Sequence, residues 1–156
     1  MDNQSINPSE TDIETGAEPT AEITFEKQEF FNWCDANDID HATEGMDEKD
    51  RTAFEKIERH FTGAIKEKRL TVDGEKFVYT VSEKSPNAGE KFTVKPPNGR
   101  AMLAMDGFKG TNENQKLQAF IAAICGVEKR DISKISGLNI KDYRVLQDVA
   151  ILFLTE

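Results

Sequence analysis

The sequence predicts an α+β protein: a β-hairpin or small three-stranded antiparallel sheet followed by a bundle of short helices, with a preceding amphipathic helix and a disordered acidic N-terminal tail. Two observations predict the folded part. Apolar residues recur at helical spacing before residue 69 and again after residue 99. Between them, short runs of β-branched and aromatic residues alternate around turn residues. A third observation, the scarcity of apolar residues in 1–22, predicts the tail.

Negative charge is concentrated at the N-terminus. The 156 residues carry a net charge of −9, and residues 1–26 hold seven acidic residues and no Lys or Arg. The other residues of 1–22 are mainly Ser, Asn, Pro and Thr, so the segment cannot bury enough apolar surface to offset the entropy of ordering. We therefore expect a disordered acidic tail at 1–22, then an aromatic segment, an acidic linker and an amphipathic helix within 23–69, and a more apolar module at 70–156.

An aromatic segment follows the tail. Residues 23–34 contain four aromatic side chains in acidic surroundings. This density predicts a short amphipathic helix that begins at Thr24 and packs back on the body of the protein. The alternative is a peptide that binds a partner, and its candidate contact residues are Phe30, Phe31 and Trp33.

A long amphipathic helix is predicted over about residues 47–69. The acidic residues Asp47, Glu48 and Asp50 suit the positive end of the helix dipole. The segment Asp35–Asp50 does not match a calcium-binding loop, because Asp40 occupies the place of the turn glycine. The apolar face of the helix repeats at three- and four-residue spacing, through Phe54, Ile57, Phe61, Ala64 and Ile65.

After residue 69 the spacing of apolar residues changes from that of a helix to that of β-strands. Residues 70–81 are β-branched and aromatic around Asp73-Gly74, a dipeptide suited to a tight hairpin turn. Residues 91–95 alternate as a third strand, which Pro96-Pro97 ends. These features predict a small antiparallel sheet.

Short helices are predicted after the sheet. Asn98 can cap a helix at 99–106, and Asn112 or Asn114 can cap the next helix, which leaves at Gly126. Each Asn offers a side-chain oxygen to the free N–H groups of a first helical turn.

Two more helices complete the bundle. One is predicted over 128–135. The last is predicted to open with a variant of the capping box formed by Asn139 and Asp142, with Asp in place of Glu. Its end carries four consecutive apolar residues that cannot all face one core, so some should be exposed or covered by a partner. These candidate partner-binding residues are Ile151, Leu152, Phe153 and Leu154.

Several classes of function are excluded or disfavoured. No phosphate-binding loop, metal-site spacing or nucleophile motif is present, so we expect no enzyme activity, no cofactor and no metal site. His60 is expected to be solvated or half-buried rather than catalytic, and Cys34 and Cys125 to be free thiols. The chain lacks a basic stripe for nucleic acid and an apolar run long enough for a membrane.

The C-terminal half resembles the tail assembly chaperones of long-tailed bacteriophages. The resemblance lies in the order of short patterns: FTVKPPNGR at 92–100, AMLAMD at 101–106, ICGV at 124–127, ISKI at 132–135 and DYRVL at 142–146. Together with the preceding hairpin they span roughly residues 70–154. Each pattern alone is common by chance, and their order and spacing carry the resemblance.

The resemblance implies a non-enzymatic role in the cytoplasm of the host bacterium. Members of this family bind the tape measure protein, keep its apolar helices soluble and help recruit tail tube protein. Many are also made in a longer, frameshifted form. Residues 1–69 depart from the short family members, which leaves open whether this chain is one of a frameshift pair.

Two alternatives remain open at the level of sequence. One is a structural tail component, such as a completion or tube-associated protein, and the other is an acidic phage-encoded inhibitor of a host protein. Self-association as a homo-oligomer is also left open.

Overall fold

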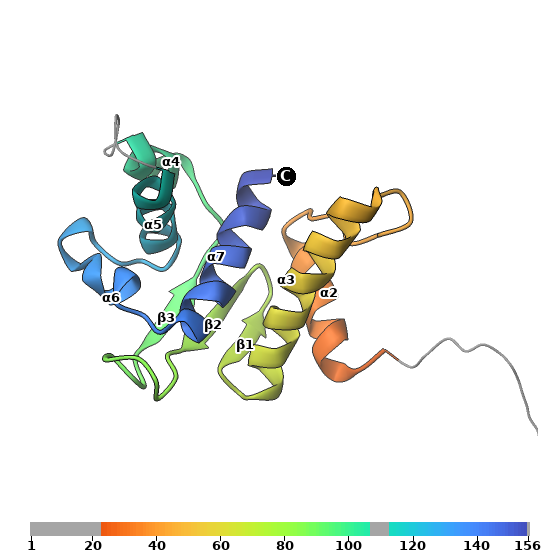
Figure 1. Cartoon of the computed structure of the whole chain (residues 1–156), viewed down its shortest axis with the longest axis horizontal. Helices are drawn as coiled ribbons and strands as arrows, with labels where there is room; N and C mark the ends of the chain where they lie inside the picture. Colours follow the sequence, from red (N-terminus) through yellow and green to blue (C-terminus); the bar gives the residue numbers. More distant parts are fainter. Residues whose placement is uncertain (1–22, 107–112, 156) are drawn as a thin grey trace, which may run out of the picture.

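The structure is a computed structural model, and it describes residues 23–106 and 113–155. The predicted α+β class is confirmed: within these residues a three-stranded antiparallel sheet is combined with six α-helices (Figure 1). The predicted tail at 1–22 lies outside the described residues. The elements in chain order are α2 (Phe25–Ala36), α3 (Glu48–Lys66), β1 (Leu70–Asp73), β2 (Lys76–Thr80), β3 (Lys91–Val94), α4 (Gly99–Asp106), α5 (Glu113–Ile124), the 3₁₀-helix η2 (Lys129–Asp131), α6 (Ser133–Ser136) and α7 (Ile140–Thr155).

Both N-terminal helices begin at side-chain caps. At the start of α2, the hydroxyl of Thr24 accepts a hydrogen bond from the backbone N–H of Lys27 (3.2 Å). At the start of α3, the Asp47 carboxylate accepts a hydrogen bond from the backbone N–H of Asp50 (2.8 Å). The prediction that the aromatic segment forms a helix starting at Thr24 and packing on the body is confirmed.

Three helices end in the same left-handed turn. After α5, Gly126 adopts φ 72°, and the N–H of Val127 reaches back to the carbonyl of Ala122 (2.8 Å). Asp38 (φ 58°) and Lys68 (φ 64°) occupy the equivalent positions after α2 and α3. The turn at Lys68 explains why α3 ends at Lys66, earlier than the predicted residue 69.

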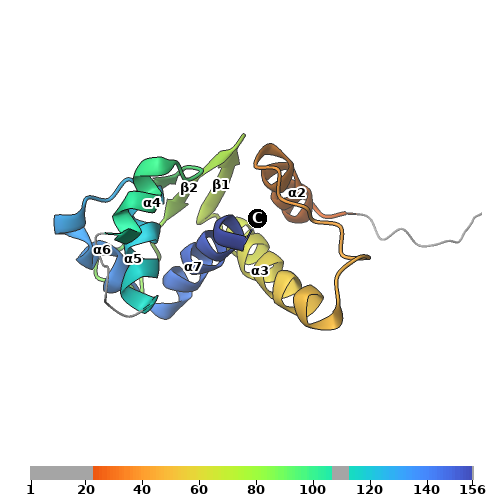
Figure 2. The same cartoon turned by 90° about the horizontal axis from the view of Figure 1, so that it is seen from above.

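The sheet has one buried face. Its order is β1-β2-β3, with Leu70 opposite Tyr79 and Tyr79 opposite Phe92. Figures 1 and 2 show α7 and α3 side by side across this sheet, with α4, α5 and α6 grouped at the β3 side. The buried residues of this face are Leu70, Phe77, Tyr79, Phe92 and Val94.

The C-terminal helices lie near their predicted positions, but some of their caps and boundaries differ from the prediction. The side chain of Asn98 accepts a hydrogen bond from the N–H of Ala101 (3.1 Å), as expected for a cap of α4. Asn114 lies inside α5 and is not its cap, while Asn112 lies outside the described residues. The prediction of a single helix at 128–135 was wrong. The segment forms two separate short helices, η2 and α6, which are joined at Ile132.

One core joins the segments before and after residue 69. Phe30 and Trp33 of α2 pack with Phe61 of α3 at ring-centroid distances of 5.0 Å. Trp33 also contacts Phe77 of β2 (5.9 Å) and Phe153 of α7 (5.6 Å). Residues 23–69 are therefore part of the same hydrophobic core as the sheet and the last helix.

Candidate functional site

The aromatic candidates divide between core and surface. Phe30 and Trp33 have no exposed surface, so a partner could not touch them without unfolding α2. Phe31 is half-buried, and its ring stacks on that of His41 with 4.3 Å between centroids. The amine of Lys27 lies 5.8 Å from the Phe31 centroid.

The apolar end of α7 is divided in the same way. Leu152 is buried and Phe153 is half-buried against Trp33. Ile151 (38 %) and Leu154 (39 %) are exposed. The four residues therefore do not all face one core, as expected. Most of the apolar surface that this end of α7 exposes belongs to Ile151 and Leu154.

Sequence reasoning missed a larger apolar surface on α4. The neighbouring residues Met102 and Leu103 are 49 % and 67 % exposed. Because α4 has only eight residues and faces α5 with Ala101, these two side chains point away from the core. The available signal was the apolar run AMLAM, in which two large residues stand side by side in a helix too short to bury both.

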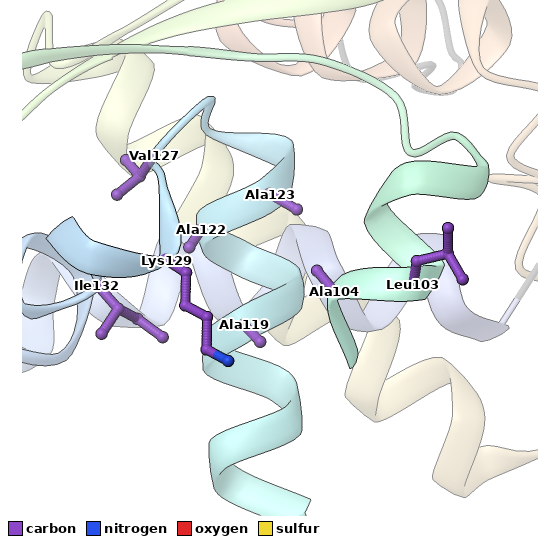
Figure 3. Close-up of a pocket in the computed structure, with 8 residues that line it drawn as sticks. All are labelled: Leu103, Ala104, Ala119, Ala122, Ala123, Val127, Lys129 and Ile132. Carbon is purple, nitrogen blue, oxygen red and sulfur yellow. The ribbon is translucent and has the colours of Figure 1, made fainter. Parts of the chain in front are cut away.

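Beside Leu103 lies an apolar cavity of about 230 Å³, which we call the α4–α5 cavity. It is hollow because small side chains form much of its wall: Ala104 from α4 and alanines along α5 (Figure 3). In Figure 3 the Lys129 side chain extends along α5 toward Ala119, so one cation borders an otherwise apolar space. The lining residues are Leu103, Ala104, Ala119, Ala122, Ala123, Val127, Lys129 and Ile132.

A second cluster is centred on a buried carboxylate in the first turn of α7. Asp142 has no exposed surface. Its Oδ1 atom accepts hydrogen bonds from the Tyr79 hydroxyl (2.6 Å) and the Ser82 N–H (3.1 Å), and its Oδ2 atom from the hydroxyls of Ser82 (2.8 Å) and Ser85 (2.6 Å). The Arg69 guanidinium lies 3.6 Å from Oδ1 and also donates to the Tyr79 hydroxyl.

These contacts set the charge of the cluster. Burial alone would raise the pKa of Asp142, but hydrogen bonds from Ser85, Tyr79 and Ser82 outweigh it and hold the pKa below its ordinary value. Burial and the neighbouring carboxylate raise the pKa of Tyr79, so its hydroxyl stays protonated and donates. With its carboxylate fully covered, the cluster joins β2, the following loop and α7.

The predicted capping box at Asn139 and Asp142 is wrong in its contacts. The Asn139 side chain does cap the helix, accepting from the N–H of Lys141 (3.0 Å). The Asn139 N–H, however, donates to the Ser85 hydroxyl (2.8 Å), which in turn donates to Asp142. The Asp side chain is one methylene shorter than Glu, and a hydroxyl from a distant loop stands between the two ends of the box.

The histidines and cysteines have structural surroundings. The Nδ1 atom of His60 lies 2.6 Å from the Asp148 carboxylate, which ties α3 to α7, and His60 is half-buried as expected. Burial raises the pKa of Asp148, and the His60 contact opposes this. Cys34 and Cys125 are buried free thiols, and burial raises the pKa of Cys125, which disfavours a reactive thiolate.

Within residues 23–106 and 113–155, no three His, Cys, Asp or Glu side chains are grouped to hold a metal ion. Over the same ranges, no helix is long and apolar enough to cross a membrane. Comparisons of the chain with models of protein families, with curated proteins and with solved structures find no match.

Proposed function

We propose that this chain is a tail assembly chaperone that binds apolar helical segments of a phage tape measure protein in the bacterial cytoplasm before the tail is complete. The order of sequence patterns in residues 92–146 supports the family. The observation that carries the client-binding role is the α4–α5 cavity with the exposed Leu103 at its edge. We propose no chemical step and no cofactor for this role.

The size of the cavity suits side chains of a client. At about 230 Å³ it is below the range of about 300–1,000 Å³ typical of small-molecule sites. It has room for one or two aliphatic side chains, and burying each contributes about 1.5–3 kcal/mol. A contact of this strength holds a client reversibly, as a chaperone that leaves the finished tail requires.

Coexpression with the tape measure protein of the same phage tests the proposal. We expect the client to be soluble with the natural chain and insoluble alone. The variant Met102→Ser/Leu103→Ser should reduce the soluble fraction, because it removes the exposed apolar surface beside the cavity. The matched control is Ile140→Ser, which removes a similarly exposed apolar side chain (57 %) from the start of α7 and should leave rescue unchanged.

A second variant pair separates the two apolar surfaces. Ile151→Ser/Leu154→Ser removes the exposed residues at the end of α7 and spares the buried Leu152. If only this pair abolishes rescue, the client site lies on α7 and not at the α4–α5 cavity. If the natural chain itself leaves the client insoluble, the chaperone proposal fails.

Mass spectrometry of purified virions distinguishes a chaperone from a structural tail component. A chaperone leaves the finished tail, so we expect no copies of this chain in virions. Stoichiometric copies would contradict the proposal and favour a permanent tail interface.

A further inference from the structure

The helices α3 and α7, which lie side by side in Figures 1 and 2, border a second groove, of about 250 Å³. We call it the α3–α7 groove. Four cationic side chains and a histidine line it, together with one carboxylate. The groove is therefore positively charged, although the whole chain carries a net charge of −9. The charged and titratable lining residues are Arg59, His60, Glu67, Arg69, Lys141 and Arg144.

Two of the four cations already have partners. The Arg69 guanidinium lies 2.8 Å from the Glu67 carboxylate and 3.6 Å from the buried carboxylate of Asp142. The Lys141 amine lies 3.2 Å from the same Glu67 carboxylate. The one carboxylate that lines the groove is therefore shared by two cations.

The other two cations are Arg59 of α3 and Arg144 of α7. Both side chains are exposed, and neither forms an ion pair with a carboxylate in residues 23–106 or 113–155. The charge of Arg144 is felt by Asp148, but the contact of that carboxylate is with His60, at 2.6 Å. A guanidinium group can donate two parallel hydrogen bonds to a carboxylate, so acidic side chains suit both arginines as ligands.

The α3 side of the groove is open because α3 carries a glycine there. Gly63 lies inside α3, where glycine is less favourable than alanine. Packing inside the chain does not account for this glycine, since a Cβ atom at its position would meet no neighbouring group within 4 Å. The missing side chain leaves room in the groove that a larger residue would fill.

An exposed aliphatic side chain stands beside the cations. Ile140, the first residue of α7, lines the groove and is 57 % exposed. A ligand that covers Ile140 with an aliphatic group would remove apolar area from water. The groove therefore offers one ligand two kinds of contact, with guanidinium groups and with an aliphatic side chain.

These contacts fit an acidic protein segment better than other anions. A nucleic acid is held by many cations along its backbone, and a chain with a net charge of −9 repels a polyanion. A single phosphate would engage the arginines but would leave Ile140 uncovered. A segment in which glutamate or aspartate stands close to leucine, isoleucine or valine supplies both carboxylates and apolar surface.

We propose that the α3–α7 groove binds a segment of a partner protein that combines acidic and aliphatic residues. Its carboxylates lie on Arg59 and Arg144, an aliphatic side chain covers Ile140, and the space beside Gly63 admits the segment between the two helices. This contact is independent of the proposed chaperone role, because it uses neither the α4–α5 cavity nor the end of α7.

Titration of the isotope-enriched full chain with synthetic peptides tests the contact by nuclear magnetic resonance. The probe is a short peptide of glutamate and leucine with blocked ends, and the control peptide has glutamine in place of glutamate. We expect the glutamate peptide to shift the amide signals of Gly63, Ile140 and Arg144 in a saturable way, and the glutamine peptide to leave them unchanged. Raising the salt from about 0.1 M to about 1 M shortens the Debye length from about 10 Å to about 3 Å and should weaken the binding.

Charge variants show whether the two arginines hold the peptide. Arg59→Gln/Arg144→Gln should remove the saturable shift at Ile140. The matched control Lys95→Gln/Arg100→Gln removes the same charge from exposed positions elsewhere and should leave the shift unchanged. Dispersed amide spectra will confirm that each variant is folded.

A steric variant shows whether the peptide lies in the groove itself. Gly63→Leu keeps every charge and fills the space beside α3, so it should also remove the saturable shift at Ile140. Thr52→Leu, at an exposed position of the same helix outside the groove, is the matched control and should bind as the natural chain does.

Four results would overturn the proposal. The first is the absence of a saturable shift at the groove with the glutamate peptide, and the second is a shift that persists in Arg59→Gln/Arg144→Gln or in Gly63→Leu. The third is an equal shift with inorganic phosphate alone, which would assign a phosphate site instead. The fourth is a shift of the same signals when the natural chain is diluted without peptide, which would assign the groove to a second copy of this chain.

Discussion

The hydroxyl of Ser85 lies 2.6 Å from the Asp142 carboxylate and, on its other side, 2.8 Å from the backbone N–H of Asn139. A single oxygen thus joins the loop after β2 to the first turn of α7. Asp142 lies 57 residues after Ser85 in the sequence. Ser85 is itself 5 % exposed, so water does not readily replace it. The start of α7 is therefore fixed by tertiary contacts as well as by its cap.

Ser85→Ala should destabilise the protein by about 1–3 kcal/mol, because it leaves a buried carboxylate oxygen of Asp142 and the backbone N–H of Asn139 without this partner. Urea unfolding followed by the fluorescence of the single tryptophan measures the effect. Ser136→Ala, at an exposed position, is the control and should change the unfolding free energy by less than about 0.5 kcal/mol. Equal effects of the two variants would contradict the role of the Ser85 bridge.

Asp142→Asn should lower the unfolding free energy at pH 7 by about 3 kcal/mol, since it leaves Arg69 without its buried counter-charge. The folded-state pKa of Asp142 lies below its ordinary value, so the folded protein binds fewer protons there than the unfolded chain. Its contribution is complete above the ordinary pKa and is lost as the pH falls through the lowered folded value. The difference between variant and natural chain should therefore shrink in acid, as urea unfolding at pH 7 and pH 3 would show.

Asp148 provides a control, because its pKa is shifted in the opposite direction to that of Asp142. Burial raises its pKa in the folded protein, so at this site the folded state binds more protons than the unfolded chain. The advantage of the natural chain over Asp148→Asn should grow as the pH falls across the carboxylate range. The same pH trend in both variants would contradict the opposite pKa shifts.

Lys68→Gly should stabilise the protein by about 1 kcal/mol, because a left-handed conformation is strained for lysine and free of strain for glycine. The measurement is the midpoint of urea unfolding, compared between variants whose dependence of unfolding free energy on urea concentration is the same. Lys66→Gly, at the last residue of α3, is the matched control and should destabilise by up to about 1 kcal/mol. A loss of stability in Lys68→Gly would show that the lysine side chain stabilises this turn by contacts that outweigh the strain.

Trp33→Ala should cost about 3–5 kcal/mol, because Trp33 is fully buried against rings from α3, β2 and α7. Trp33→Phe should cost much less. It keeps a six-membered ring in place and removes a buried indole N–H that lacks an acceptor among the described residues. Calorimetric melting compares the two variants, and Phe25→Ala, at a 68 % exposed position on the same helix, serves as the control.

Local features of the fold could be predicted from sequence because each depends on a few neighbouring residues. Thr24 and Asn98 cap helices as expected, and Gly74, with φ 64°, lies in the predicted hairpin turn. The end of α3 was missed because no sequence rule anticipates a left-handed lysine at position 68. These elements are specified within one or two turns of chain.

The candidate sites could be predicted only in part, because exposure depends on which elements pack together. Exposure of some residues in the apolar run at the end of α7 was expected, but its division between Ile151 and Leu152 depends on where α7 lies over the core. The α4–α5 cavity was missed because small residues signal close packing as readily as a hollow. The Asp142 cluster was missed because Tyr79 and Ser85 approach it from 63 and 57 residues away.

The core shared by α2, α3 and α7 has a consequence for synthesis. The contact between His60 and Asp148 joins residues 88 positions apart, and Trp33 packs against Phe153 between the same helices. While the chain emerges from the ribosome, Phe77 of β2 can cover part of the aromatic face of α2 and α3, but the cover from Phe153 comes only with α7. Until α7 has been made, the nascent protein therefore exposes part of an aromatic face of its own.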